Sequence, residues 1–92
     1  MIIFHGTTEK RAKEIHSDGW DKDITFFCST RRDYAVGYAR RSWLSDTKDI
    51  PVLMTIETDS DNLILTNLTF TNGEMIIKNT ESIKILKIEV LE

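Results

Sequence analysis

The chain has little cysteine and little proline, with one of each among its 92 residues. A single Cys28 cannot form an internal disulfide, so a disulfide framework is excluded as the source of stability. The scarcity of proline, together with 40% hydrophobic and 29% charged residues, excludes a disordered or collagen-like chain. We therefore expect a packed globular domain.

The sequence also lacks a signal peptide and any apolar run long enough to span a bilayer. A lone cysteine without an internal partner agrees with a chain that needs no oxidising compartment. We expect no membrane contact and an intracellular, cytoplasmic location.

Positive charge is not in excess, because the formal net charge is −3. This balance argues against tight, sequence-independent binding to nucleic acid, which depends on many contacts from Lys and Arg to phosphates. One local basic cluster stands out, formed by Arg31, Arg32, Arg40 and Arg41. It is either the solvated face of a helix or a docking surface for phosphate or an acidic partner.

Motifs for several common chemistries are missing. Two histidines and one cysteine without metal-ligand spacing argue against a zinc site, so we expect no metal. No Walker-type glycine loop or dinucleotide fingerprint is present. A Cys28–His5 nucleophilic dyad is possible in principle, but Cys28 lies in an apolar segment, which favours a buried, inert thiol.

The length allows one domain, residues 1–92, and the patterning predicts an α+β class. Alternation and β-branched residues predict about six strands in a mixed or antiparallel sheet, with two short helices. The first helix covers residues 9–18, and the second follows Asp33. The predicted strands cover residues 1–5, 24–28, 51–57, 63–65, 75–77 and 83–91, and residues 68–70 form either a further hairpin strand or part of a tight connection.

Two details of this prediction concern the end of the chain. The turn signal Asn72-Gly73 separates segments 68–70 and 75–77 and favours a hairpin or a tight connection. In the last strand, apolar residues change phase between Ile85 and Leu86. This slip indicates either a β-bulge or a strand buried on both faces.

Three polar or aromatic side chains are candidates for chemistry. His5 ends the first predicted strand beside Gly6, where a ligand could approach the main chain, although a histidine there is often structural. Tyr38 could stack on an aromatic or pyridinium ring, or simply belong to the core. Glu74 begins an apolar strand and is either exposed or placed to stabilise positive charge as a glycosidic bond breaks.

In order, these segments resemble the ADP-ribosyltransferases of the diphtheria-toxin and poly(ADP-ribose)-polymerase type, over nearly the whole chain. Three blocks carry the resemblance. They are Phe4-His5-Gly6-Thr7 before a helix, Phe27-Cys28-Ser29-Thr30 followed by Ala35-Val36-Gly37-Tyr38, and Glu74-Met75-Ile76-Ile77 leading to a long last strand.

The resemblance implies a split sheet of that family and NAD as cosubstrate. It implies that Glu74 and His5 are catalytic, with Glu74 contacting the nicotinamide ribose and His5 the adenosine ribose. The Gly6 main chain would hold the nicotinamide amide, and Tyr38 would stack on the ring. The same blocks place Thr7, Phe27 and Cys28 among the NAD-binding residues.

The chain departs from the family where a tyrosine is usual, since that position falls on Phe27 or Cys28. Asn72 replaces a second glutamate found in arginine-modifying members, so arginine is a less expected acceptor. We favour a mono-ADP-ribosyltransferase acting on a protein, such as a host or bacterial-defence protein modified by a phage-type enzyme. The alternative is a catalytically inactive binding module that occupies a partner's surface. A nucleic-acid acceptor has less support.

Overall fold

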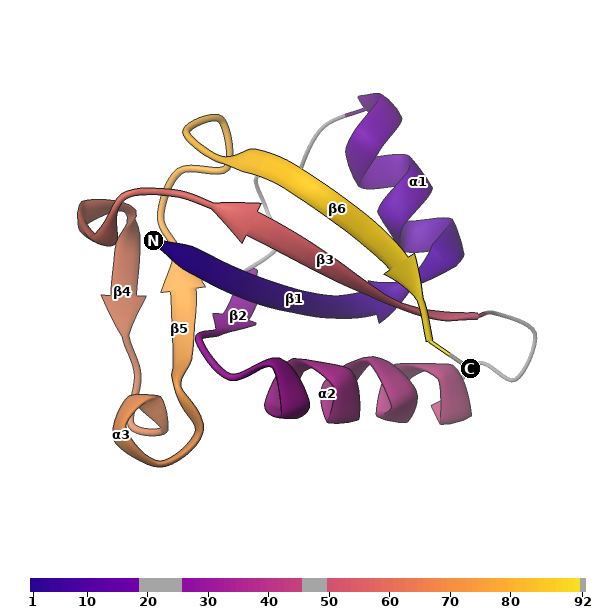
Figure 1. Cartoon of the computed structure of the whole chain (residues 1–92), viewed down its shortest axis with the longest axis horizontal. Helices are drawn as coiled ribbons and strands as arrows, with labels where there is room; N and C mark the ends of the chain where they lie inside the picture. Colours follow the sequence, from indigo (N-terminus) through magenta and orange to yellow (C-terminus); the bar gives the residue numbers. More distant parts are fainter. Residues whose placement is uncertain (19–25, 46–49, 92) are drawn as a thin grey trace.

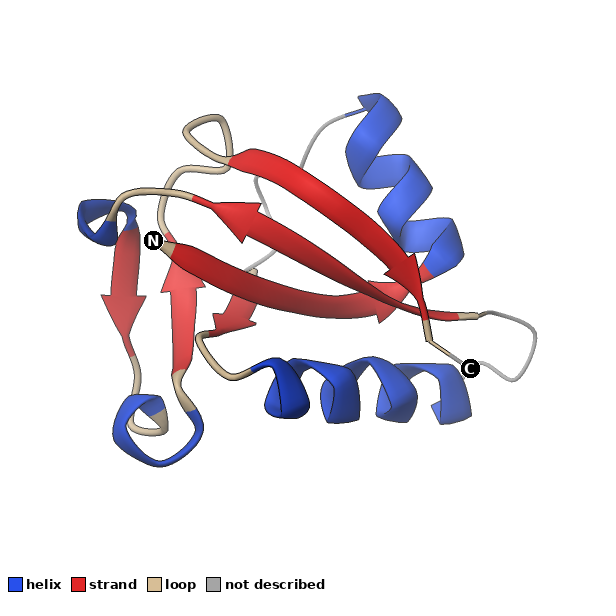
Figure 2. Ribbon diagram, in the orientation of Figure 1, coloured by secondary structure: helices blue, strands red, loops and turns tan. Residues whose placement is uncertain are grey.

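A computed structural model describes residues 1–18, 26–45 and 50–91. Within these residues, six antiparallel strands form one open sheet accompanied by three α-helices, which confirms the predicted α+β class (Figures 1 and 2). The strand order is β4-β5-β2-β1-β3-β6. The elements in chain order are β1 (Ile2–Thr8), α1 (Glu9–Asp18), β2 (Phe27–Ser29), α2 (Arg32–Ser45), β3 (Pro51–Glu57), a 3₁₀ turn (Ser60–Asn62), β4 (Leu63–Leu65), α3 (Thr69–Asn72), β5 (Glu74–Ile77) and β6 (Lys84–Val90).

Side chains alternate across the sheet, so the core forms two clusters, one on each face. The cluster on the α1 side contains Ile3, Ala12, Phe26, Cys28, Val52, Met54, Ile56, Met75 and Ile77. The cluster on the α2 side contains Ala35, Ala39, Leu53 and Leu91, with Phe4 and Val36 packed against it. Figure 1 shows α1 and α2 on different sides of the twisted strands.

The first helix begins where the sequence predicts it, at Glu9. Thr8 caps it, since the main-chain N–H of Arg11 donates to Thr8 Oγ1 at 3.3 Å. The strand before it is longer than predicted and continues through Gly6 to Thr8. Pairing with β3 over all seven residues of β1 supplies the hydrogen bonds that override the local preference of glycine.

Position 6 requires glycine because α2 lies directly against the strand there. A Cβ atom on Gly6 would clash with the Ala35 carbonyl oxygen and lie 2.8 Å from the Ala39 main-chain nitrogen. Ala35 and Ala39 are buried at this contact. Small residues on both elements therefore bring the helix close to the strand, and the close approach that Gly6 permits is to α2.

The segment between β4 and β5 contains a short helix instead of a strand. The hairpin is wrong and the tight connection agrees with the structure, because Thr69–Asn72 form α3 and Gly73 follows in the left-handed region at φ 69°. The Thr69 hydroxyl accepts from the Thr66 N–H at 2.7 Å and donates to the Glu74 carbonyl at 2.7 Å. These side-chain bonds favour the helical turn over a second hairpin strand.

The β-bulge in the last strand is confirmed. Thr55 of β3 pairs with Lys87 and Ile56 pairs with Ile85, so Leu86 is the extra residue. The bulge keeps Ile85 and Ile88 on the same face of the sheet despite their odd spacing. Burial on both faces is wrong, because no residue of β6 is fully buried. At the start of the predicted strand 24–28, residues 24 and 25 lie outside the described residues.

Candidate functional site

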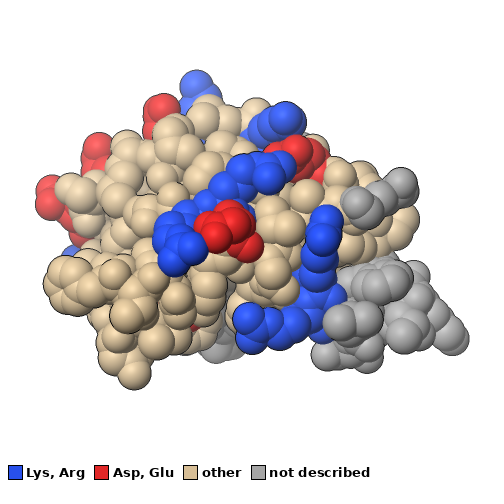
Figure 3. Space-filling view, turned by 60° about the horizontal axis from the view of Figure 1, so that its bottom comes forward, with Lys and Arg blue, Asp and Glu red and all other residues tan. Residues whose placement is uncertain are grey.

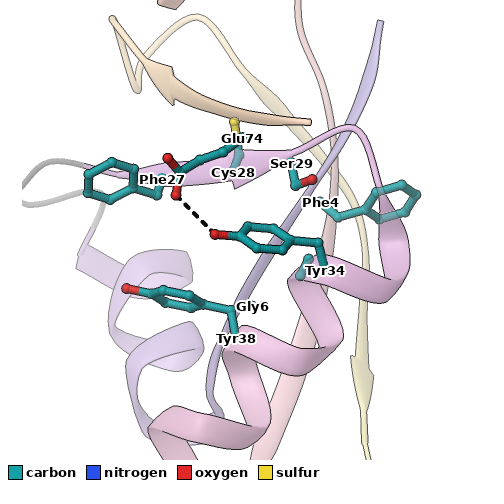
Figure 4. A pocket seen from close by; sticks show the side chains of 9 residues that line it. Phe4, Gly6, Phe27, Cys28, Ser29, Tyr34, Tyr38 and Glu74 are labelled. Carbon is teal, nitrogen blue, oxygen red and sulfur yellow. Dashed lines mark hydrogen bonds between the residues drawn. The ribbon is translucent and has the colours of Figure 1, made fainter. Parts of the chain in front are cut away.

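A hollow on the α2 side of the sheet collects residues from β1, β2, α2 and β5. It holds about 230 Å³ of empty space, part of which is open solvent. The lining residues are Phe4, Gly6, Phe27, Cys28, Ser29, Tyr34, Ala35, Tyr38 and Glu74 (Figure 4). The hollow lies beside the seam where β1 and β2 meet at Phe4 and Ser29. The pairing of β1 with β2 is short, whereas β1 pairs with β3 along its whole length.

Glu74 is the acidic group of this pocket. It is 8% exposed, and both carboxylate oxygens accept hydrogen bonds. Tyr34 Oη donates to Oε1 at 3.2 Å, and Thr66 Oγ1 donates to Oε2 at 2.9 Å. Two donors from distant parts of the chain therefore fix the carboxylate in one orientation at the pocket. Figure 4 shows the bond from Tyr34.

The turn before Glu74 is clamped to the end of β2. Ser29 Oγ donates to the Asn72 carbonyl at 2.7 Å, and the Thr30 N–H donates to the Gly73 carbonyl at 3.0 Å. A Cβ atom at Gly73 would clash with Thr30 Oγ1, and its φ of 69° also favours glycine. The Ser-Thr pair of the second block therefore helps to set the position of Glu74.

Aromatic side chains form the walls of the pocket. Tyr34 and Tyr38 are one helical turn apart on α2, and Figure 4 shows both rings projecting under β2 toward the side of Glu74 and Phe27. Tyr38 is 43% exposed and Phe27 is 39% exposed, so a ligand could reach either ring. Burial, and then the negative charge of Glu74, raise the pKa of Tyr34, which keeps its phenol protonated as a donor.

His5 and Thr7 do not line this pocket. Alternation places both side chains on the face of β1 that carries Ile3, opposite to Phe4 and Gly6. His5 is 8% exposed, and its ring packs edge-on against Phe26 with centroids 5.7 Å apart.

The ring of His5 links β1 to β2. Its Nδ1 lies 2.7 Å from the Phe27 carbonyl, and because a carbonyl only accepts, Nδ1 carries the proton. Burial is the main cause that lowers the pKa of His5, so the ring is neutral. The structure thus brings Glu74 together with Gly6, Phe27, Cys28 and Tyr38, and it gives His5 a bond across the seam.

Cys28 borders the pocket, but its thiol lies in the core on the α1 side. Figure 4 shows the sulfur pointing away from the hollow, and Sγ donates to the Met75 carbonyl at 3.4 Å. Burial, with a contribution from Glu74, raises the pKa of the thiol to about 12. A protonated, buried thiol is a poor nucleophile, which fits the inert alternative for Cys28.

The basic cluster is partly neutralised within the chain. Arg31 Nη2 lies 2.8 Å from Asp33 Oδ2, and Arg32 Nη2 lies 3.2 Å from Glu89 Oε1. Figure 3 shows basic side chains next to acidic ones on this face. The cluster is therefore a mixed-charge surface around α2.

Comparison of the chain with protein-family models, curated proteins and solved structures finds no match. Among the described residues, no group of three or more His, Cys, Asp or Glu side chains could hold a metal ion. None of the helices in this part of the chain is long and apolar enough to cross a bilayer.

The sequence prediction missed two residues that hold Glu74. Tyr34 had a signal, because it lies four residues before Tyr38 and shares its helix face. Thr66 had none, since it reaches Glu74 only through the fold of the segment between β4 and α3.

Proposed function

We propose that this protein is an NAD-dependent mono-ADP-ribosyltransferase that modifies a protein acceptor, with Glu74 as its catalytic carboxylate. One observation carries the proposal. A buried glutamate, held by two hydroxyl donors, faces a hollow whose walls include Phe27 and Tyr38. The resemblance in three sequence blocks agrees with this assignment, because residues from all three line the hollow.

The size of the hollow limits which part of NAD it would take. The hollow is small and opens to solvent, so it would contact only part of the cosubstrate. In this proposal that part is the nicotinamide ring with its amide, while the adenosine diphosphate part would lie outside. Tyr38 and Phe27 offer ring faces for a positively charged pyridinium, and Gly6 contributes main chain to the wall.

Glu74 supplies the chemistry that bond cleavage requires. Its carboxylate would accept a hydrogen bond from a ribose hydroxyl and stabilise the positive charge that develops on the ribose. NAD supplies the ADP-ribose group, and nicotinamide leaves with the electron pair of the broken glycosidic bond. An acceptor nucleophile then bonds to the same ribose carbon and loses its proton.

Tyr34 and Thr66 act as positioning residues in this scheme. Their hydrogen bonds fix both oxygens of Glu74 before substrate binds, so less reorganisation is needed during the reaction. The ribose contact expected for His5 stays a prediction. The observed contacts give its buried ring a second role in joining β1 to β2.

The test measures nicotinamide release and label transfer from labelled NAD in a lysate of the cells that harbour the protein. Glu74→Gln keeps the shape of the side chain and removes its charge, so release and transfer should fall roughly 100-fold or more. Glu57→Gln is the matched control, because Glu57 is an exposed carboxylate on β3 outside the pocket lining. It should keep wild-type activity.

Further outcomes separate the alternatives. If protease removes the label from the product and nuclease does not, the acceptor is a protein. The reverse result identifies a nucleic-acid acceptor. If the wild-type chain releases no nicotinamide and NAD causes no thermal shift, the enzyme proposal is wrong. The binding module is then the remaining assignment.

A further inference from the structure

Among the described residues, no strand pairs with the outer edge of β6. It is the last strand of the described sheet, next to β3 only, and Figures 1 and 2 show no strand beyond it. Three of its apolar side chains are unusually exposed: Leu86 at 45%, Ile88 at 40% and Val90 at 51%. An exposed edge with apolar side chains is a template for pairing with another strand.

The ladder with β3 shows which main-chain groups point outward. The Leu91 N–H donates to the Pro51 carbonyl at 2.8 Å, and residues of an antiparallel strand alternate in the direction of their hydrogen bonds. Glu89 and Lys87 therefore point their N–H and C=O groups toward β3. Ile88 and Val90 point theirs away from the sheet, where a new strand could pair.

Charge decides the register in which two copies of β6 could pair. Two identical strands can pair antiparallel with Lys87, Ile88 or Glu89 at the centre. In each of these registers, residues whose N–H and C=O groups point outward face each other. Centring on Lys87 places two lysines opposite each other, and centring on Glu89 places two glutamates opposite each other. Like charges directly opposite are unfavourable.

In the register centred on Ile88, opposite charges face each other. It places Lys87 of each copy opposite Glu89 of the other, so the strand is complementary to itself. Both side chains lie on the α2 face, where Glu89 is 3.2 Å from Arg32 and 3.8 Å from Lys87 of the same chain. The two Ile88 side chains meet on the other face, and the Ile88 main-chain groups bond to each other.

We propose that a second copy of this chain docks on β6, forming a two-fold dimer through antiparallel pairing centred on Ile88. The Leu86 bulge limits the length of regular pairing, so the interface is small and the dimer depends on concentration. The pocket lies beside β2 and β5, on the other side of β1 from this edge. Both pockets stay open, and the inference does not depend on the proposed function.

Sedimentation equilibrium on the full chain tests the proposal at protein concentrations up to roughly 1 mM, the range of weak association. The wild type should show a concentration-dependent dimer that weakens with added salt, because its ion pairs are exposed. Lys87→Glu places two pairs of like charges across the interface and should weaken dimerisation about tenfold. A wild type that stays monomeric throughout this range overturns the proposal.

A mixture of two variants makes the test specific to the register. In a heterodimer of Lys87→Glu with Glu89→Lys, every pair across the interface is again opposite in charge. The mixture should therefore associate as tightly as the wild type, although each variant alone associates weakly. Circular dichroism of each variant checks folding, which matters because Glu89→Lys also loses the Arg32 contact. Equal association of the mixture and the separate variants would contradict the Ile88-centred register.

Discussion

Glu74 is the residue on which the proposed chemistry depends, and its environment comes from three parts of the chain. Its main chain starts β5 just after the left-handed Gly73. Its side chain is held by Tyr34 of α2 and by Thr66, which follows β4. A carboxylate that is buried and hydrogen-bonded on both oxygens needs little reorganisation to act on charge in a substrate.

Removing one donor tests this arrangement at the scale of a single residue. In Tyr34→Phe the ring remains, but Oε1 of Glu74 loses its hydrogen bond. We expect the free energy of unfolding to fall by about 1 kcal/mol and nicotinamide release to fall about fivefold to tenfold. Chemical denaturation and a release assay measure the two effects.

The control for Tyr34→Phe is Thr71→Val. Thr71 is exposed on α3, and its hydroxyl makes a long bond of 3.4 Å to the Leu68 carbonyl. This variant should leave both quantities unchanged. If Tyr34→Phe behaves like Thr71→Val, the Tyr34 bond does not position Glu74.

At the scale of elements, the packing of α2 on β1 shapes one wall of the pocket. Gly6 allows the helix to approach the strand, and Ala35 and Ala39 fill the contact. Tyr34 and Tyr38 are on the same helix, so its distance from β1 also sets where their rings lie. A change in this distance should alter stability and pocket shape together.

Two glycine-to-alanine substitutions test the contact, because they should change the free energy of unfolding in opposite directions. In Gly6→Ala the new methyl group would meet main-chain atoms of α2. The free energy of unfolding should therefore fall by about 1–3 kcal/mol, and nicotinamide release should also fall. Gly37→Ala meets no atom within 4 Å and replaces glycine inside a helix. It should stabilise the chain by about 0.5–1 kcal/mol. Thermal or urea unfolding measures both, and equal effects would contradict the packing argument.

At the scale of the whole molecule, His5 joins the two parts of the sheet. One part contains β1, β3 and β6, and the other contains β2, β5 and β4. Across their seam, Phe4 pairs with Ser29 and His5 Nδ1 donates to the Phe27 carbonyl. Protonating this buried ring should therefore lower the stability of the whole sheet.

The direction of the pH effect follows from the lowered pKa of His5. The unfolded chain takes up a proton near the usual value of 6.5, while the buried ring in the folded chain does so only at lower pH. The stability from the neutral ring is fully present above pH 6.5. As the pH falls below 6.5, the free energy of unfolding should drop by up to about 1.4 kcal/mol per pH unit, until the folded ring also ionises.

Urea unfolding between pH 7.5 and about 5 measures this effect. His5→Asn is the comparison, because its side-chain amide can also donate to a carbonyl but does not titrate. Carboxylates titrate in both proteins, so the difference between the two profiles isolates His5. Parallel profiles would show that His5 is not buried as a neutral ring.

Local features of the sequence predicted much of the fold. The 9–18 helix, the strand at 51–57 and the bulge near Leu86 all leave signals within a few residues, through capping, alternation and a phase slip. Glu74 was also predicted at the start of its strand. For segment 68–70 the sequence could not choose between a hairpin and a tight connection, because Thr69 makes bonds to Thr66 and Glu74 that a propensity pattern does not contain.

The sequence by itself determined the α+β class, most element boundaries and the candidate role of Glu74, since each depends on short-range patterns. Only the tertiary structure decided which candidates meet. It placed Tyr34 and Thr66 on Glu74, turned the Cys28 thiol into the core and put His5 at the seam. The reason is that a pocket depends on which face of each strand a residue occupies and on which strands become neighbours, and long-range packing sets both.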